Sequence, residues 1–90
     1  MSFVQVRDHA LWLEDIHGNA ALQQRIREMR EGERIELRVE GVRGTWRRLK
    51  DGAGGRSSPG IKAEGHAQSK WHELRNERRG GLATVEVCDS

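Results

Sequence analysis

The hydrophobic residues of this chain recur at regular intervals. Within residues 33–40 apolar and charged side chains alternate strictly, with Ile35, Leu37 and Val39 on one side and acidic or basic residues on the other. This period of two predicts a strand that has one buried and one solvated face. Residues 82–88 alternate in the same way and predict a last strand.

After Gly18 the apolar residues recur with a period close to 3.6. Leu22, Ile26 and Met29 stand at positions i, i+4 and i+7, which form one apolar stripe on a helix. Asn19 is a suitable N-cap residue before the stripe, and Gly32 is a typical stop after it. The pattern predicts an amphipathic helix between these two residues.

Shorter patterns predict the elements of the N-terminal half. Residues 3–6 read as a short strand with two valines on one face. Residues 8–16 read as a short helix, because Asp8 suits an N-cap, an apolar run follows, and Gly18 is a typical end.

Two further patterns complete the secondary structure. Residues 45–50 read as the return arm of a hairpin, after a turn at residues 41–44. Trp46 and Leu49 cannot share a face under a period of two, so either a bulge intervenes or only one of them is buried. A second amphipathic helix is predicted between Ser69, a suitable N-cap, and Gly80, which with Gly81 closes it. Its apolar stripe is formed by Ala67, Trp71, Leu74 and the stem of Arg78.

The expected order of elements is therefore β-α-β-β-α-β. This is the order of the ferredoxin-like split βαβ motif. We expect a single α+β domain over residues 1–90, with a four-stranded, mainly antiparallel sheet and helices on one face. In an alternative α+β arrangement, residues 8–18 pack separately.

One long segment lacks any apolar period. Residues 51–66 combine Gly, Ser and the only proline, and they predict a long loop. Loops of this length are uncommon in compact domains unless they serve a function. The segment is therefore a candidate for binding.

Composition narrows the class of protein. Val, Ile, Leu and Phe make up only 18 of 90 residues, but the net charge is a low +2 and the apolar positions are periodic, which favours a folded domain. The sequence has no apolar run long enough to span a membrane and no pattern typical of a secretory signal. A single Cys fits a reducing compartment, so we expect a cytoplasmic protein. Arg outnumbers Lys by 13 to 3, which is typical of a GC-rich genome and suggests a bacterial source.

The low net charge hides a concentrated basic segment. Residues 41–62 carry six basic side chains against Asp51 alone, a net charge of +5, whereas the flanking segments are mildly acidic. Clustered positive charge attracts polyanions, and exposed backbone N–H groups of a Gly-rich loop can bind anions. Trp46 could stack on a nucleic-acid base. The candidate nucleic-acid or anion-binding residues are Arg43, Arg47, Arg48, Lys50, Gly54, Gly55, Arg56, Lys62 and Trp46, with Gly60 as a further point of close backbone approach.

The same residues have a purely structural interpretation. Arg43, Arg47 and Arg48 can pair with glutamates across the hairpin, and the tryptophans can fill the core. No phosphate-binding loop, metal-ligand spacing or nucleophile with a neighbouring base is present in the sequence. We therefore expect no cofactor and no metal site, and the sequence favours a non-catalytic protein over an enzyme.

Three functions remain open from the sequence. The first is a non-catalytic module that binds nucleic acid or another polyanion through residues 43–62. The second is a protein-interaction module, in which the basic segment docks on an acidic protein surface or a second copy forms a homo-oligomer. The third is an enzyme that acts on a phosphorylated small molecule, with a pocket near Gly54 and Arg56.

Overall fold

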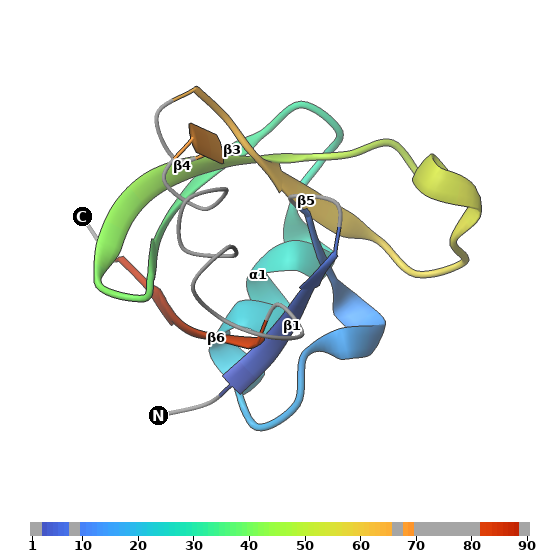
Figure 1. Ribbon diagram of the computed structural model, residues 1–90. Coiled ribbons are helices and arrows are strands. Elements are labelled where there is room, and N and C mark those ends of the chain that lie inside the picture. Colours follow the sequence, from blue (N-terminus) through green and yellow to red (C-terminus); the bar gives the residue numbers. More distant parts are fainter. Residues whose placement is uncertain (1–2, 8–9, 66–67, 70–81, 89–90) are drawn as a thin grey trace.

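The computed structural model describes residues 3–7, 10–65, 68–69 and 82–88. In chain order the elements are β1 (Phe3–Arg7), β2 (Ala10–Trp12), the 3-10 turn η1 (Leu13–Asp15), α1 (Ala20–Glu28), β3 (Arg34–Val39), β4 (Val42–Arg48), the 3-10 turn η2 (Ala53–Gly55), β5 (Gly60–Ala63) and β6 (Leu82–Val87) (Figure 1).

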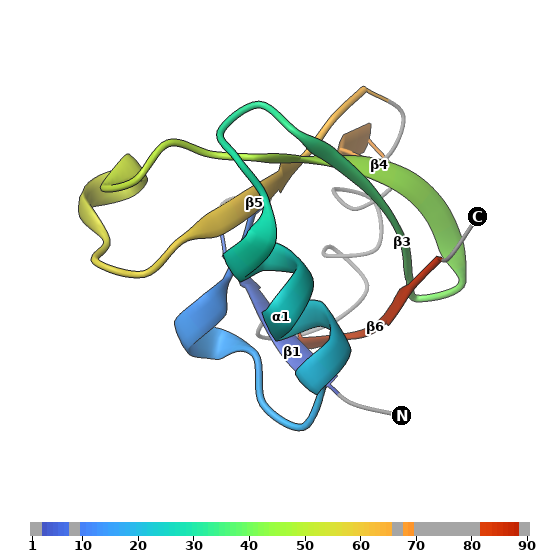
Figure 2. The same cartoon turned by 180° about the vertical axis from the view of Figure 1, so that it is seen from behind.

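The six strands form a closed antiparallel barrel. Their order around the barrel is β1-β2-β5-β4-β3-β6, and β6 pairs with β1 to complete the circle (Figures 1 and 2). The described residues are mostly strand, with one short helix, α1, that packs on the barrel through Leu22 and Ile26. The expected ferredoxin-like α+β fold, a four-stranded sheet with helices on one face, is therefore wrong.

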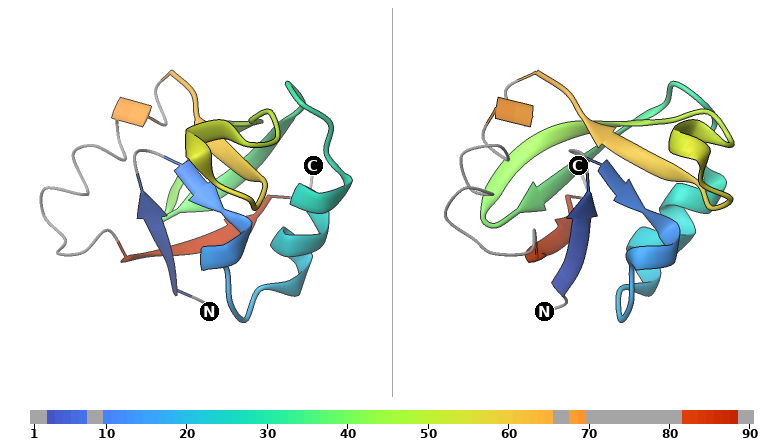
Figure 3. Two further views of the ribbon diagram at one scale, coloured as in Figure 1. Left: turned by 90° about the vertical axis from the view of Figure 1, so that its right-hand side faces the viewer. Right: turned by 45° about the vertical axis from the view of Figure 1, so that its right-hand side comes forward.

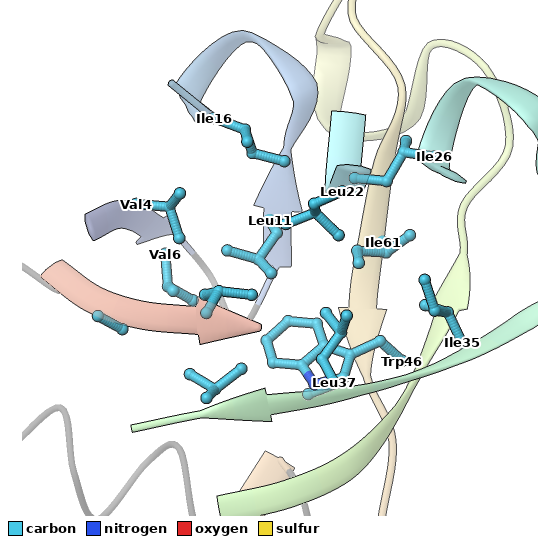
Figure 4. Packing of buried hydrophobic residues seen from close by; sticks show 14 of the residues in the cluster. Val4, Val6, Leu11, Ile16, Leu22, Ile26, Ile35, Leu37, Trp46 and Ile61 are labelled. Carbon is cyan, nitrogen blue, oxygen red and sulfur yellow. The ribbon is translucent and has the colours of Figure 1, made fainter. Parts of the chain in front are cut away.

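The interior of the barrel is filled by side chains from every strand and from α1. Trp46 is the largest of these side chains and is 1% exposed. Leu11, Leu37 and Ile61 come from three other strands, and their side chains are fully buried in the same cluster (Figure 4). Because one hydrophobic cluster contains residues from all six strands, each strand depends on this common core.

The most regular sequence patterns predicted their elements correctly. In β3 the alternation of exposed and buried residues follows the sequence pattern, with Ile35, Leu37 and Val39 buried. The N-terminus of α1 is capped as expected, because the side-chain oxygen of Asn19 accepts a hydrogen bond from the backbone N–H of Leu22. The strands at both ends of the chain are also confirmed.

The hairpin of β3 and β4 is tighter than expected. Val39 pairs with Val42, so Glu40 and Gly41 alone form the turn, and both have positive φ. Two-residue turns of this kind match the twist of the strands, and Gly adopts the conformation without strain. The turn is held against β6, since the Glu40 carboxylate accepts hydrogen bonds from the backbone N–H and hydroxyl of Thr84.

The predicted helix over residues 8–16 is wrong. Ala10–Trp12 is strand β2, and only the single turn η1 follows it. Leu11 points into the barrel, whereas Trp12 lies on the outer face and is still only 5% exposed. The apolar run resembled a helix because both faces of this strand are covered, which removes the alternation that normally marks a strand.

The predicted loop over residues 51–66 contains a strand. Gly60–Ala63 is β5, which lies between β2 and β4 in the barrel and buries Ile61. The connection that carries η2 projects from one side of the barrel (Figures 1 and 3). The composition of β5 is not typical of a strand, so pairing with its two neighbours decides its structure.

The second predicted helix, from Ser69 to Gly80, lies outside the described residues except for its expected N-cap, Ser69, which is itself helical together with Gln68. Trp46 and Leu49 follow one of the two expected alternatives: Trp46 is buried and Leu49 is only half-buried.

Gly60 allows the close approach of β5 to Trp12. A Cβ atom at this position would lie 2.5 Å from Cε3 of the Trp12 ring and 3.1 Å from the backbone oxygen of Leu11. We predict that Gly60→Ala lowers the free energy of unfolding by about 1–3 kcal/mol, because a tightly packed site must shift to admit the methyl group. Chemical denaturation measures this change.

The same substitution in a Trp12→Leu background serves as the control. The smaller side chain leaves room for the new methyl group, so the cost of Gly60→Ala should fall by at least half. An equal cost in both backgrounds would show that the Trp12 ring is not the cause.

Candidate functional site

A row of three cationic side chains crosses the outer face of the barrel. Arg34 on β3 pairs in register with Arg47 on β4, and Arg47 pairs in register with Lys62 on β5. All three are exposed, because their neighbours along the strands point into the core. Adjacent strands are about 4.8 Å apart, so this cationic row extends over roughly 10 Å.

Most of the charge of the cationic row is not compensated. Arg34 forms an ion pair with Glu64, at 2.8 Å between Nε and Oε1. For Arg47 and Lys62 the described part of the chain supplies no ion pair. Like charges directly opposite each other on neighbouring strands are destabilising. The arrangement therefore has a cost for folding and offers a positive surface to an anion.

A depression of about 320 Å³ adjoins the cationic row at Arg47. It lies between the connection from α1 to β3 and the segment from the end of β4 to η2. Its lining residues are Glu31, Gly32, Arg47, Arg48, Leu49, Lys50 and Ala53. Lys50 is exposed and, like Arg47, has no ion-pair partner among the described residues. The depression therefore brings two uncompensated cations to one place.

Backbone hydrogen bonds join the two walls of this depression. The N–H of Gly32 donates to the oxygen of Arg48 at 2.9 Å, and the N–H of Arg48 donates to the oxygen of Glu33 at 2.8 Å. These bonds continue the pairing of β3 with β4 beyond the end of the strands. The relative position of the two walls is therefore set by the barrel.

Arg48 has a structural role. Its side chain is 9% exposed, and its guanidinium donates to the backbone oxygens of Ile26 and Leu49 and to the Asp51 carboxylate. Ile26 lies in the last turn of α1, where its backbone oxygen also accepts a 3.3 Å hydrogen bond from the N–H of the C-cap residue Met29. Arg48 thus joins the end of α1 to the end of β4, and its charge lies beneath the surface of the depression.

Arg56 also has a structural role. Its guanidinium carbon lies 5.0 Å from the centre of the Trp12 ring, and the group forms ion pairs with Glu14 and Asp15 of η1. This combination of a cation–π contact and acidic partners holds the η2 connection over Trp12. Gly54 belongs to the same contact, since a Cβ atom there would lie 3.3 Å from the ring.

Arg43 lies near the start of β4, close to the hairpin turn, and forms an ion pair with Glu36 of β3. Its side chain donates to the Glu36 carboxylate at 2.5 Å. This hydrogen bond, together with the negative charge of Glu36, raises the pKa of Arg43 above its ordinary value. The structural interpretation from the sequence, a cross-strand pair with a glutamate, describes Arg43 correctly.

Two further residues of the candidate set, Trp46 and Gly55, belong neither to the cationic row nor to the depression. Trp46 lies in the core, so its ring is not accessible to a base. Gly55 is exposed on the η2 connection, with open space around its Cα. The depression does not include Gly54 or Arg56, near which a small-molecule pocket was expected.

Sequence reasoning missed two residues of this surface, Arg34 and Glu31. Arg34 falls on the charged side of the alternation over residues 33–40, and Glu31 stands between the last apolar residue of the helical stripe, Met29, and Gly32. Strand register places Arg34 beside Arg47, and the backbone hydrogen bond between Gly32 and Arg48 brings Glu31 to the same depression as Lys50. The sequence carries no local signal for either neighbour.

In the described part of the chain, no three or more His, Cys, Asp or Glu residues are grouped to hold a metal ion. No described helix is long and apolar enough to cross a membrane. His9, His66 and His72 lie outside the described residues.

We predict that Arg48→Met lowers the free energy of unfolding by about 2 kcal/mol, because the backbone oxygens of Ile26 and Leu49 lose the hydrogen bonds from the guanidinium while the apolar stem is kept. Chemical denaturation measures the loss. Asp51→Asn is the matched control and should cost less than about 0.5 kcal/mol, since this side chain is 91% exposed. A similar cost for both variants would contradict the assigned role of Arg48.

Comparisons of the chain with models of protein families, with curated proteins and with solved structures give no match. The functional inference therefore rests on the residues of the chain itself.

Proposed function

We propose that this protein is a non-catalytic module that binds nucleic acid by contacting the phosphate groups of the nucleic acid. The binding surface consists of the cationic row and Lys50. The observation that carries the proposal is the position of Arg47, which lies opposite one cation on each neighbouring strand while neither it nor Lys62 has an acidic partner among the described residues.

The arrangement of charge favours a polyanion over a single small anion. The three side chains of the cationic row lie on adjacent strands, and Lys50 extends the positive surface toward η2. A chain of phosphates can contact several of these cations at once and releases its counterions when it does so. Binding would also relieve the repulsion between the opposed cations.

The surface is suited to phosphates rather than to bases. Both tryptophans that the structure describes, Trp12 and Trp46, are buried, so neither offers a stacking platform. Contacts to phosphates position a nucleic acid but carry no sequence information. We therefore expect binding that depends strongly on salt and little on sequence.

We predict that Arg47→Gln and Lys62→Gln each weaken binding of a single-stranded oligonucleotide by about three- to tenfold at 50 mM salt. Each should also reduce the slope of log affinity against log salt by about 0.7, because one phosphate contact is lost. Fluorescence anisotropy with a labelled oligonucleotide measures both quantities.

Arg43→Gln is the matched control, because it removes the same charge from the outer face of the barrel at a residue already paired with Glu36. It should change affinity less than either variant of the cationic row. The absence of detectable binding at low salt would overturn the proposal. So would equally strong binding of polyglutamate, which would instead indicate an acidic protein partner.

A further inference from the structure

The depression beside the cationic row has a lining of mixed charge. Arg47 and Lys50 lie in it together with Glu31, and no ion pair joins Glu31 to either cation in the described structure. A carboxylate at this place repels a phosphate. The lining is therefore better suited to a ligand that presents an anionic group to the cations and a hydrogen-bond donor to Glu31.

The depression is bounded by two hydrogen-bonded backbone segments and by the buried guanidinium of Arg48. Its walls are joined by the backbone hydrogen bonds between Gly32, Arg48 and Glu33, so the backbone next to Glu31 is tied to the end of β4, next to Lys50. The buried Arg48 guanidinium adds positive charge beneath it, partly balanced by Asp51. The volume of about 320 Å³ falls at the lower end of the range for small-ligand sites.

A nucleotide unit of RNA carries both of the required groups. Its phosphate is anionic, and its 2′-hydroxyl can donate a hydrogen bond that DNA cannot supply. We propose that the depression binds one ribonucleotide of an RNA chain, with phosphate contacts from Arg47 and Lys50 and the 2′-hydroxyl donating to the Glu31 carboxylate. This inference rests on the proposed nucleic-acid binding and adds to it a preference for RNA over DNA.

The preference follows from the chemistry of Glu31. A hydrogen bond to an ionised acceptor is stronger than one between neutral groups. With a deoxyribonucleotide in the same place, the carboxylate would lose this donor and would still repel the phosphate. The energetic difference between the two sugars is therefore larger than a neutral acceptor would give.

The test compares three oligonucleotides of equal length and identical bases: oligouridylate, its 2′-deoxy form and its 2′-O-methyl form. With the unaltered protein at 50 mM salt, we expect oligouridylate to bind about tenfold more tightly than either of the others. The 2′-O-methyl form keeps an oxygen at the 2′ position but cannot donate from it, so it separates hydrogen bonding from the shape of the sugar. Fluorescence anisotropy gives the three dissociation constants.

Glu31→Ala should reduce the ratio of RNA to DNA affinity to about one, mainly by weakening RNA binding. Glu28→Gln is the matched control: it removes one negative charge from the end of α1, outside the depression, and should leave the ratio unchanged. A ratio that survives in Glu31→Ala, or a 2′-O-methyl form that binds as tightly as RNA, would overturn the role of Glu31.

Different results would overturn the ribonucleotide site and the phosphate-binding surface. Equal binding of the ribose and deoxyribose forms by the unaltered protein would overturn the ribonucleotide site and leave the phosphate-binding surface in place. Failure to bind any of the three oligonucleotides would overturn the proposed function and the ribonucleotide site with it.

Discussion

The indole ring of Trp46 occupies the interior of a closed barrel and is the largest side chain in the shared core. Six short strands can close around this space because each contributes a small number of apolar residues to the same cluster. The order of the strands follows from that shared interior. Closure also removes free sheet edges among the described strands, which a small domain would otherwise have to protect from unwanted pairing.

A second tryptophan, Trp12, packs on the outer face of the barrel. Trp12 covers part of that face and is covered in turn by Gly54 and the Arg56 guanidinium of the η2 connection and by Gly60 at the start of β5. These contacts determine where the connection runs after β4. They therefore also place Lys50 and Ala53 opposite the end of α1, where the depression forms. The packing of an apolar ring and the position of a cationic surface are thus parts of one arrangement.

The basic segment found in the sequence divides into two groups in the structure. Arg43, Arg48 and Arg56 are held by acidic side chains or backbone oxygens. Arg47, Lys50 and Lys62 remain on the surface without ion-pair partners among the described residues, and strand register adds Arg34 beside them. Charge density along the chain located the segment, but it could not separate the groups. Arg43 finds its partner seven residues away across the hairpin, whereas Arg56 pairs with Glu14, 42 residues away, and only the fold shows which cations are paired.

The sequence by itself determined the elements whose periodicity reflects burial on one side. The alternation of β3 and the apolar stripe of α1 are local properties, and an N-cap residue needs only its own helix. Tertiary structure alone decided the status of β2 and β5. The first is covered on both faces, and the second has a composition that takes the form of a strand only between two neighbours. It also decided the closure of the barrel and the juxtaposition of Arg34, Arg47 and Lys62, since register between strands depends on how the whole core packs.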